Sequence, residues 1–114
     1  MTTDRELLEL AAKAAMVVYE SRYIEPIGVQ FAGLLMNIGI ANRSAEFWNP
    51  LTDDGDALRL AVKLRLEFEW WKNGIAVSRD DLPPGTIQHV EDDPYAATRR
   101  AIVRAAAEIG KATK

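Results

Sequence analysis

Few side chains in this sequence are of a type that carries acid–base or metal chemistry. His89 is the single histidine and cysteine is absent, so histidine pairs, Cys-based zinc sites and thiolate nucleophiles are excluded. The run Asp53-Asp54-Gly55-Asp56 lacks the alternating oxygen ligands and the distal glutamate of an EF-hand loop, and acids in this pattern are typical of a helix start. A metal-assisted hydrolase built on Asp53, Asp54, Asp56 and His89 is therefore the weakest hypothesis.

Other catalytic patterns are missing or weak. The sequence has no P-loop, no dinucleotide-binding fingerprint and no nucleophile elbow. Glu67 and Glu69 fall on one face of a predicted strand, as paired glycosidase carboxylates do, but strands place many charge pairs in this way. We therefore expect a protein that is not an enzyme, binds no cofactor and holds no metal ion.

Aromatic residues are the candidates for protein binding. In an alternating strand, an inward Trp70 turns Trp71 to the opposite face, the face of Glu67 and Glu69. Either a helix covers that face, or Trp71 is exposed and contacts another chain, since tryptophan is enriched in binding hot spots. Trp48 has two similar alternatives, core packing or a loop anchor. The interaction candidates are Trp71, Trp48, Glu67 and Glu69.

Basic residues gather near the end of the chain. From Tyr95 onward there are five bases against Glu108 alone. Bases along a helix complement its dipole, which is one explanation. The alternative is an anion-binding face, because Arg100 and Arg104 stand one turn apart and a phosphate would relieve their repulsion. The anion-binding candidates are Arg99, Arg100 and Arg104.

The clearest local prediction is a β-hairpin over residues 66–79. Two alternating runs flank Asn73-Gly74, which favours a two-residue type I′ turn because both residues tolerate positive φ. The pairs expected from this turn are Lys72 with Ile75, Trp70 with Val77 and Phe68 with Arg79. The expected buried face contains Leu66, Phe68, Trp70, Ile75 and Val77.

Three helices are predicted around this hairpin. Their spans are about Asp4 to Tyr19, Thr52 or Asp53 to Leu64, and Pro94 to Gly110. Thr3 and Glu6 have the spacing of a capping box, and Thr52 and Asp53 are both good caps for the second helix. Asp92 or Asp93 caps the third helix, and Gly110 is its natural stop. The second helix is the most apolar, and we expect it to pack on a sheet. Its expected core residues are Leu58, Ala61 and Val62, with Leu60 and Leu64 beside them.

Further strands are expected between the helices. The residues at 17–19 leave open an earlier end of the first helix and a passage into a strand. Residues 27–31 alternate as a half-buried strand does, and residues 34–36 either extend it or form a second strand. Residues 37–47 are typical of a loop, and residues 86–90 of a short strand.

Length and composition indicate one domain over residues 1–114. The chain is 48% hydrophobic and 27% charged, so it is able to bury a core, and its net charge of −3 is too small to define a partner. The N-terminus does not resemble a signal peptide and no apolar run has the length of a membrane span. We expect a cytoplasmic protein without membrane contact. The predicted fold is α+β, a single α/β/α sandwich in the order α-β(β)-α-β-β-α, with a small, mainly antiparallel sheet and helices on both faces.

Two motifs carry a family resemblance. The first joins Trp48-Asn49-Pro50-Leu51 to Asp53-Asp54-Gly55-Asp56-Ala57-Leu58-Arg59-Leu60-Ala61, and the second is Asp93-Pro94-Tyr95-Ala96-Ala97-Thr98-Arg99-Arg100-Ala101-Ile102-Val103-Arg104-Ala105-Ala106-Ala107-Glu108. Together they resemble the small phage and prophage proteins grouped as the phage ABA sandwich domain family. The resemblance implies an α/β/α sandwich in a bacterial or phage protein. That family is uncharacterised, so it lends no active-site residues.

Two function hypotheses follow. The preferred one is a non-enzymatic phage or prophage accessory protein that binds another protein, or a second copy of itself, through Trp71 or residues 22–47. The alternative is a module that binds nucleic acid or another anion through the arginines of the last helix.

Overall fold

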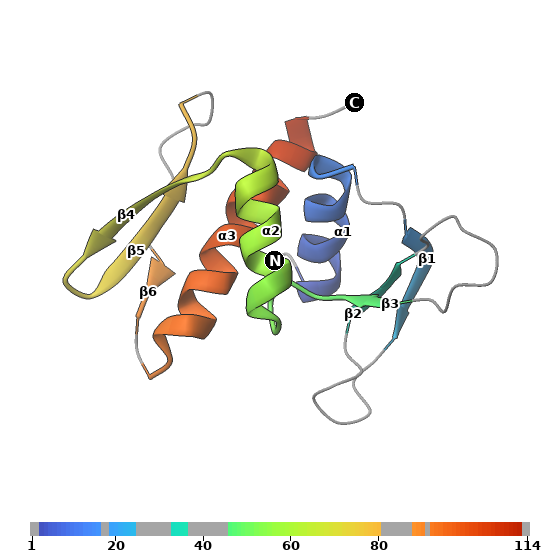
Figure 1. Cartoon of the computed structure of the whole chain (residues 1–114), viewed down its shortest axis with the longest axis horizontal. Helices are drawn as coiled ribbons and strands as arrows, with labels where there is room; N and C mark the ends of the chain where they lie inside the picture. Colours follow the sequence, from blue (N-terminus) through green and yellow to red (C-terminus); the bar gives the residue numbers. More distant parts are fainter. Residues whose placement is uncertain are drawn as a thin grey trace.

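Three helices form the middle of the molecule, and one small sheet lies on each side of them (Figure 1). The structure is a computed structural model of the chain. The residues that it describes are 3–16, 19–24, 33–36, 46–80, 88–90 and 92–112. The helices are α1 (Asp4–Ala14), α2 (Asp54–Leu64) and α3 (Pro94–Ala112).

Each helix begins next to a side chain that accepts hydrogen bonds from its first turn. The Thr3 hydroxyl accepts from the Glu6 amide, and the Glu6 carboxylate accepts from the Thr3 amide, which makes the predicted capping box. Asp53 caps α2 through a 2.8 Å bond from the amide of Asp56. Asp93 caps α3 by accepting from two first-turn amides. The caps expected for all three helices are confirmed.

The strands form two three-stranded antiparallel sheets. The first contains β1 (Tyr19–Ile24), β2 (Gly33–Met36) and β3 (Glu46–Trp48), and the second contains β4 (Glu67–Trp71), β5 (Gly74–Ser78) and β6 (Gln88–His89). In each sheet the strands lie in chain order. The expected α+β class is confirmed. Instead of one sheet between helices, however, the described residues place the helices between two sheets, because α3 packs against β5 and β6 while α1 packs against β2.

The first helix ends earlier than its expected limit. α1 stops at Ala14, and Met16 takes a positive φ of 57°, which an α-helix does not accommodate. β1 then begins at Tyr19, so the alternative of an early stop followed by a strand is confirmed. Residues 34–36 belong to β2, a strand separate from β1. The predicted strand at 27–31 lies outside the described residues.

α2 packs through a different face from the one predicted. Its buried residues are Ala57, Leu60, Ala61 and Leu64. Their spacing makes one stripe along the helix, whereas Leu58 and Val62 are exposed. The prediction of a core role for these two residues is wrong because α2 packs mainly on one neighbour, α3, and not on a sheet.

The predicted hairpin forms, but its register differs from the expected one by two residues. The paired residues include Glu67 with Ser78, Phe68 with Val77, Trp70 with Ile75, and Trp71 with Gly74. Lys72 and Asn73 form the turn, and neither has a positive φ, so the expected type I′ turn is wrong. The third strand explains the shift. His89 of β6 pairs with Gly74, and the Val90 amide donates to the Asn73 carbonyl, which draws Gly74 into the sheet.

This register keeps Phe68 and Trp70 on the face of Ile75 and Val77, but it does not bury them. Ile75 and Val77 are buried as predicted, whereas Phe68 is 42% exposed and Trp70 is 64% exposed. Their predicted burial is wrong. α3 packs against β5 and β6, so it covers the part of the sheet that contains these two strands. β4 lies at the other edge of the sheet, and its side chains are exposed to solvent. Leu66, just before β4, is buried.

The main helix contact joins α1 to α3 (Figure 1). The small buried residues of these helices include Ala11 and Ala12 of α1 and Ala101, Ala105, Ala106 and Ala107 of α3. Gly110 does not end the third helix as predicted, since α3 continues to Ala112. A Cβ at Gly110 would overlap the backbone carbonyl of Leu10. Glycine is therefore required at this position because the two helix backbones approach each other closely.

We expect Gly110→Ala to lower the free energy of unfolding by about 1–3 kcal/mol, the usual cost of overpacking a filled contact. Gly55→Ala is the matched control, because the atoms nearest to a Cβ at Gly55 are the ends of the exposed side chains of Arg59 and Asp53, at 3.1–3.2 Å, and none of these is a backbone atom. Alanine there gains helix propensity and raises stability by up to about 1 kcal/mol. Urea denaturation followed by circular dichroism measures both. Equal stability of the two variants would contradict the backbone contact.

Candidate functional site

β4 leaves the helical layer directly after α2. Arg65 ends α2 with a positive φ of 55°, and its amide bonds to the carbonyls of Ala61 and Val62. The amide of Leu66 also donates to the Ala61 carbonyl, and the side chain of Leu66 is buried in the core. These contacts fix the start of β4, and the strand then runs outward from the helices (Figure 1).

Three exposed aromatic rings lie on β4, on both of its faces. Phe68 and Trp70 project from one face, and Trp71, which is 52% exposed, projects from the other. Trp71 lies opposite Gly74, which has no side chain to cover the indole. Single exposed apolar residues are common, whereas three exposed rings on one five-residue strand make that strand a candidate interaction site.

Two carboxylates share the face of Trp71. Glu67 and Glu69 are exposed, as predicted for one strand face. No ion pair or side-chain hydrogen bond joins either of them to another residue of the described part of the chain. We call the group formed by these residues the β4 surface. It consists of Glu67, Phe68, Glu69, Trp70 and Trp71.

Trp48 does not belong to any exposed surface. It is only 6% exposed and lies in the main core cluster, so the structure agrees with its core alternative. The next residue, Asn49, accepts from the amide of Leu51 and donates its own amide to the carboxylate of Asp56. The motif that begins at Trp48 therefore holds the preceding chain against the start of α2.

The three arginines of α3 bind three different parts of the molecule. Their partners are the Leu51 carbonyl and Asp54 for Arg99, Asp4 of α1 for Arg100, and Gln88 of β6 for Arg104. Arg99 is the most enclosed, with 17% of its side chain exposed and a 2.6 Å bond to Asp54. Because each guanidinium is directed to a different element, the structure does not bring the three together as one anion-binding face.

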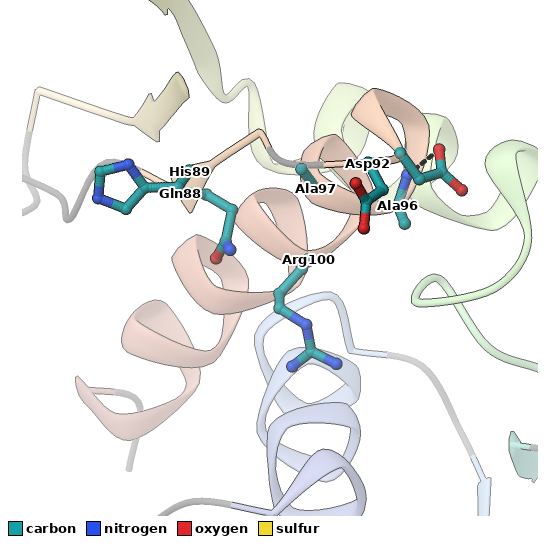
Figure 2. A pocket seen from close by; sticks show the side chains of 7 residues that line it. Gln88, His89, Asp92, Ala96, Ala97 and Arg100 are labelled. Atoms are coloured by element: carbon teal, nitrogen blue, oxygen red, sulfur yellow. Dashed lines mark hydrogen bonds between the residues drawn. The ribbon is translucent and has the colours of Figure 1, made fainter. Parts of the chain in front are cut away.

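A pocket of about 380 Å³ lies where β6 meets the start of α3 (Figure 2). Its lining residues are Gln88, His89, Asp92, Asp93, Ala96, Ala97 and Arg100. Gln88 is bound to Arg104, Asp93 caps α3, and Arg100 is paired with Asp4. Figure 2 shows the ring of His89 pointing away from Arg100 and Asp92. The described side chains of the pocket therefore do not converge as an acid–base pair.

The aspartates at the start of α2 each have a structural partner. Asp53 caps the helix, Asp54 pairs with Arg99, and Asp56 accepts from Arg59. None of them lines the pocket that contains His89, so the groups of the hydrolase hypothesis lie apart. Within the described ranges, no three acidic or histidine side chains are placed to hold a metal ion.

Phe68 and Trp70 are the candidate residues that sequence reasoning did not identify. Alternation correctly assigned them to the face of Ile75 and Val77, but it does not tell how far a covering helix extends. The signal in the sequence was local density, since three aromatic residues stand among two acids within the five residues of β4.

Comparison with known proteins does not supply a role. No family model, no curated protein and no solved structure matches the chain. The resemblance to the phage ABA sandwich domain family therefore stays a prediction. None of the described helices is both long enough and apolar enough to cross a bilayer.

We expect Arg99→Ala to destabilise the fold by about 1–3 kcal/mol, because it leaves the Leu51 carbonyl without its donor in a partly buried position and also removes the ion pair with the exposed Asp54. Arg104→Ala is the control, since Arg104 is exposed and its loss should change stability by less than about 0.5 kcal/mol. Thermal and urea unfolding of both variants measures the difference. A larger loss at Arg104 than at Arg99 would contradict the assignment of Arg99 as the structural arginine.

Proposed function

We propose that this protein is a non-enzymatic protein-interaction module that binds its partner through the β4 surface. The observation that carries the proposal is the exposure of Phe68, Trp70 and Trp71 on a strand that α3 does not cover. Burial of a large apolar side chain contributes about 1.5–3 kcal/mol. Because these three rings stay exposed in the folded chain, a partner that buries them gains that free energy on binding.

The charge of the β4 surface supports a protein partner over a nucleic acid. Glu67 and Glu69 share the strand face of Trp71 and would repel a phosphate backbone. The arginines of α3, which were the alternative candidates for phosphate binding, are directed to partners inside the molecule. The nucleic-acid alternative therefore lacks a supporting observation.

The biological setting is a separate part of the proposal. The motifs at residues 48–61 and 93–108 support a place among the accessory proteins of phages and prophages. This part rests on the family resemblance alone.

We expect Trp70→Ser combined with Trp71→Ser to weaken partner binding by at least about 30-fold, the loss typical of a tryptophan hot spot. Both rings are exposed, so the variant should keep its circular dichroism spectrum and melting temperature. The partner is first isolated from the organism that encodes the chain and then purified. Titration calorimetry with the purified partner gives the two dissociation constants.

The matched control is Leu58→Ser combined with Val62→Ser, which removes two exposed apolar side chains from α2. This variant should bind the partner as the original protein does. If binding is lost in the α2 variant and kept in the β4 variant, the proposed surface is wrong.

A further inference from the structure

We infer that the β4 surface binds by strand addition, in which a partner protein contributes an extended segment with basic residues at alternate positions. The inference rests on the proposed function and specifies the chemistry of its partner. Three observations support it, namely the direction of the β4 backbone groups, the lack of ion-pair partners for Glu67 and Glu69 among the described residues, and the exposed aromatic rings of the same strand.

The hydrogen bonds of the second sheet show which backbone groups of β4 are free. The Val90 amide donates to the Asn73 carbonyl, so the backbone groups of residues 73, 75 and 77 point to β6 and those of 74, 76 and 78 point to β4. The latter pair with residues 71, 69 and 67. The amide and carbonyl groups of Phe68 and Trp70 therefore point to the outer edge of β4.

That outer edge has no strand partner in the described part of the chain, because the sheet order is β4-β5-β6. Natural edge strands are commonly protected by charged side chains, above all lysine, by proline or by a β-bulge. The charges of β4 are the carboxylates of Glu67 and Glu69, which oppose an acidic strand and favour a basic one. β4 has no proline or lysine, and its pairing with β5 runs without interruption from Glu67 to Trp71. Such an edge accepts an added strand through main-chain hydrogen bonds, while side-chain contacts select the sequence.

The charges of β4 select one class of segment. Opposite charges placed directly across a strand pair are stabilising and like charges are destabilising. A second copy of β4 would add two more carboxylates to the face of Glu67 and Glu69. A segment with lysine or arginine opposite these residues, and apolar residues opposite Phe68 and Trp70, complements both faces. We therefore assign the occupant as an alternating basic and apolar segment of another protein.

The test uses amide hydrogen exchange by NMR on the full chain with two synthetic peptides. One peptide alternates lysine with valine, and the other alternates glutamate with valine. With the lysine peptide at ten times its dissociation constant, exchange at the Phe68 and Trp70 amides should slow about tenfold. The glutamate peptide should not change it, and amides of α1 should exchange at the same rate throughout.

A charge-reversal variant separates local pairing from overall attraction. In the variant that combines Glu67→Lys with Glu69→Lys, the glutamate peptide should slow exchange at the Phe68 and Trp70 amides, and the lysine peptide should no longer do so. Glu9→Lys combined with Glu108→Lys makes the same change in net charge on α1 and α3, and it should keep the original preference. Equal behaviour of the two variants would contradict a charge contact on β4.

Other outcomes overturn the inference. Protection by neither peptide, or equal protection by both, would exclude selective strand addition. Protection without peptide that increases with protein concentration would assign the edge to a second copy of the chain. The proposed function fails by a different result, namely unchanged partner binding when Trp70 and Trp71 are replaced by serine.

Discussion

The approach of α1 to α3 at Gly110 is the contact on which the other parts of the fold depend. The carbonyl of Leu10 occupies the space that a side chain at Gly110 would need, and most of the other buried residues of the two helices are alanines. α1 stands near the beginning of the chain and α3 near its end, so this contact joins distant parts of the sequence. It also holds the two sheets in one molecule, because β2 packs on α1 while β5 and β6 pack on α3.

Polar contacts fix the orientation of α3 around this apolar centre. Arg99 connects it to the start of α2, Arg100 connects it to α1, and Arg104 connects it to β6. Exposed ion pairs contribute little free energy each, but their three directions leave few alternative positions for the helix. None of these contacts involves the β4 surface. The residues that maintain the fold and the residues proposed to bind a partner are therefore different residues.

Local chemistry explains which features were predictable from the sequence. The three helix caps depend on side chains within a few residues of the helix start, and they were predicted. The register of the hairpin depends on β6, whose residues lie far along the chain, so the Asn73-Gly74 motif alone gave the wrong turn. Gly110 has the sequence pattern of a helix stop, and only the position of Leu10 shows its packing role. For the candidate site, Trp71, Glu67 and Glu69 were identified from alternation. Phe68 and Trp70 were missed because their exposure depends on how far α3 extends over the sheet.

The position of β4 outside the helical layer also affects how the protein evolves. Substitutions in a buried stripe are constrained by packing, whereas residues 67–71 lie in solvent on a strand that follows the buried Leu66 and whose last residue pairs with Gly74 of β5. Sequence drift at these five positions costs the folded state little. Substitutions at these positions therefore need no compensating mutations in the interior.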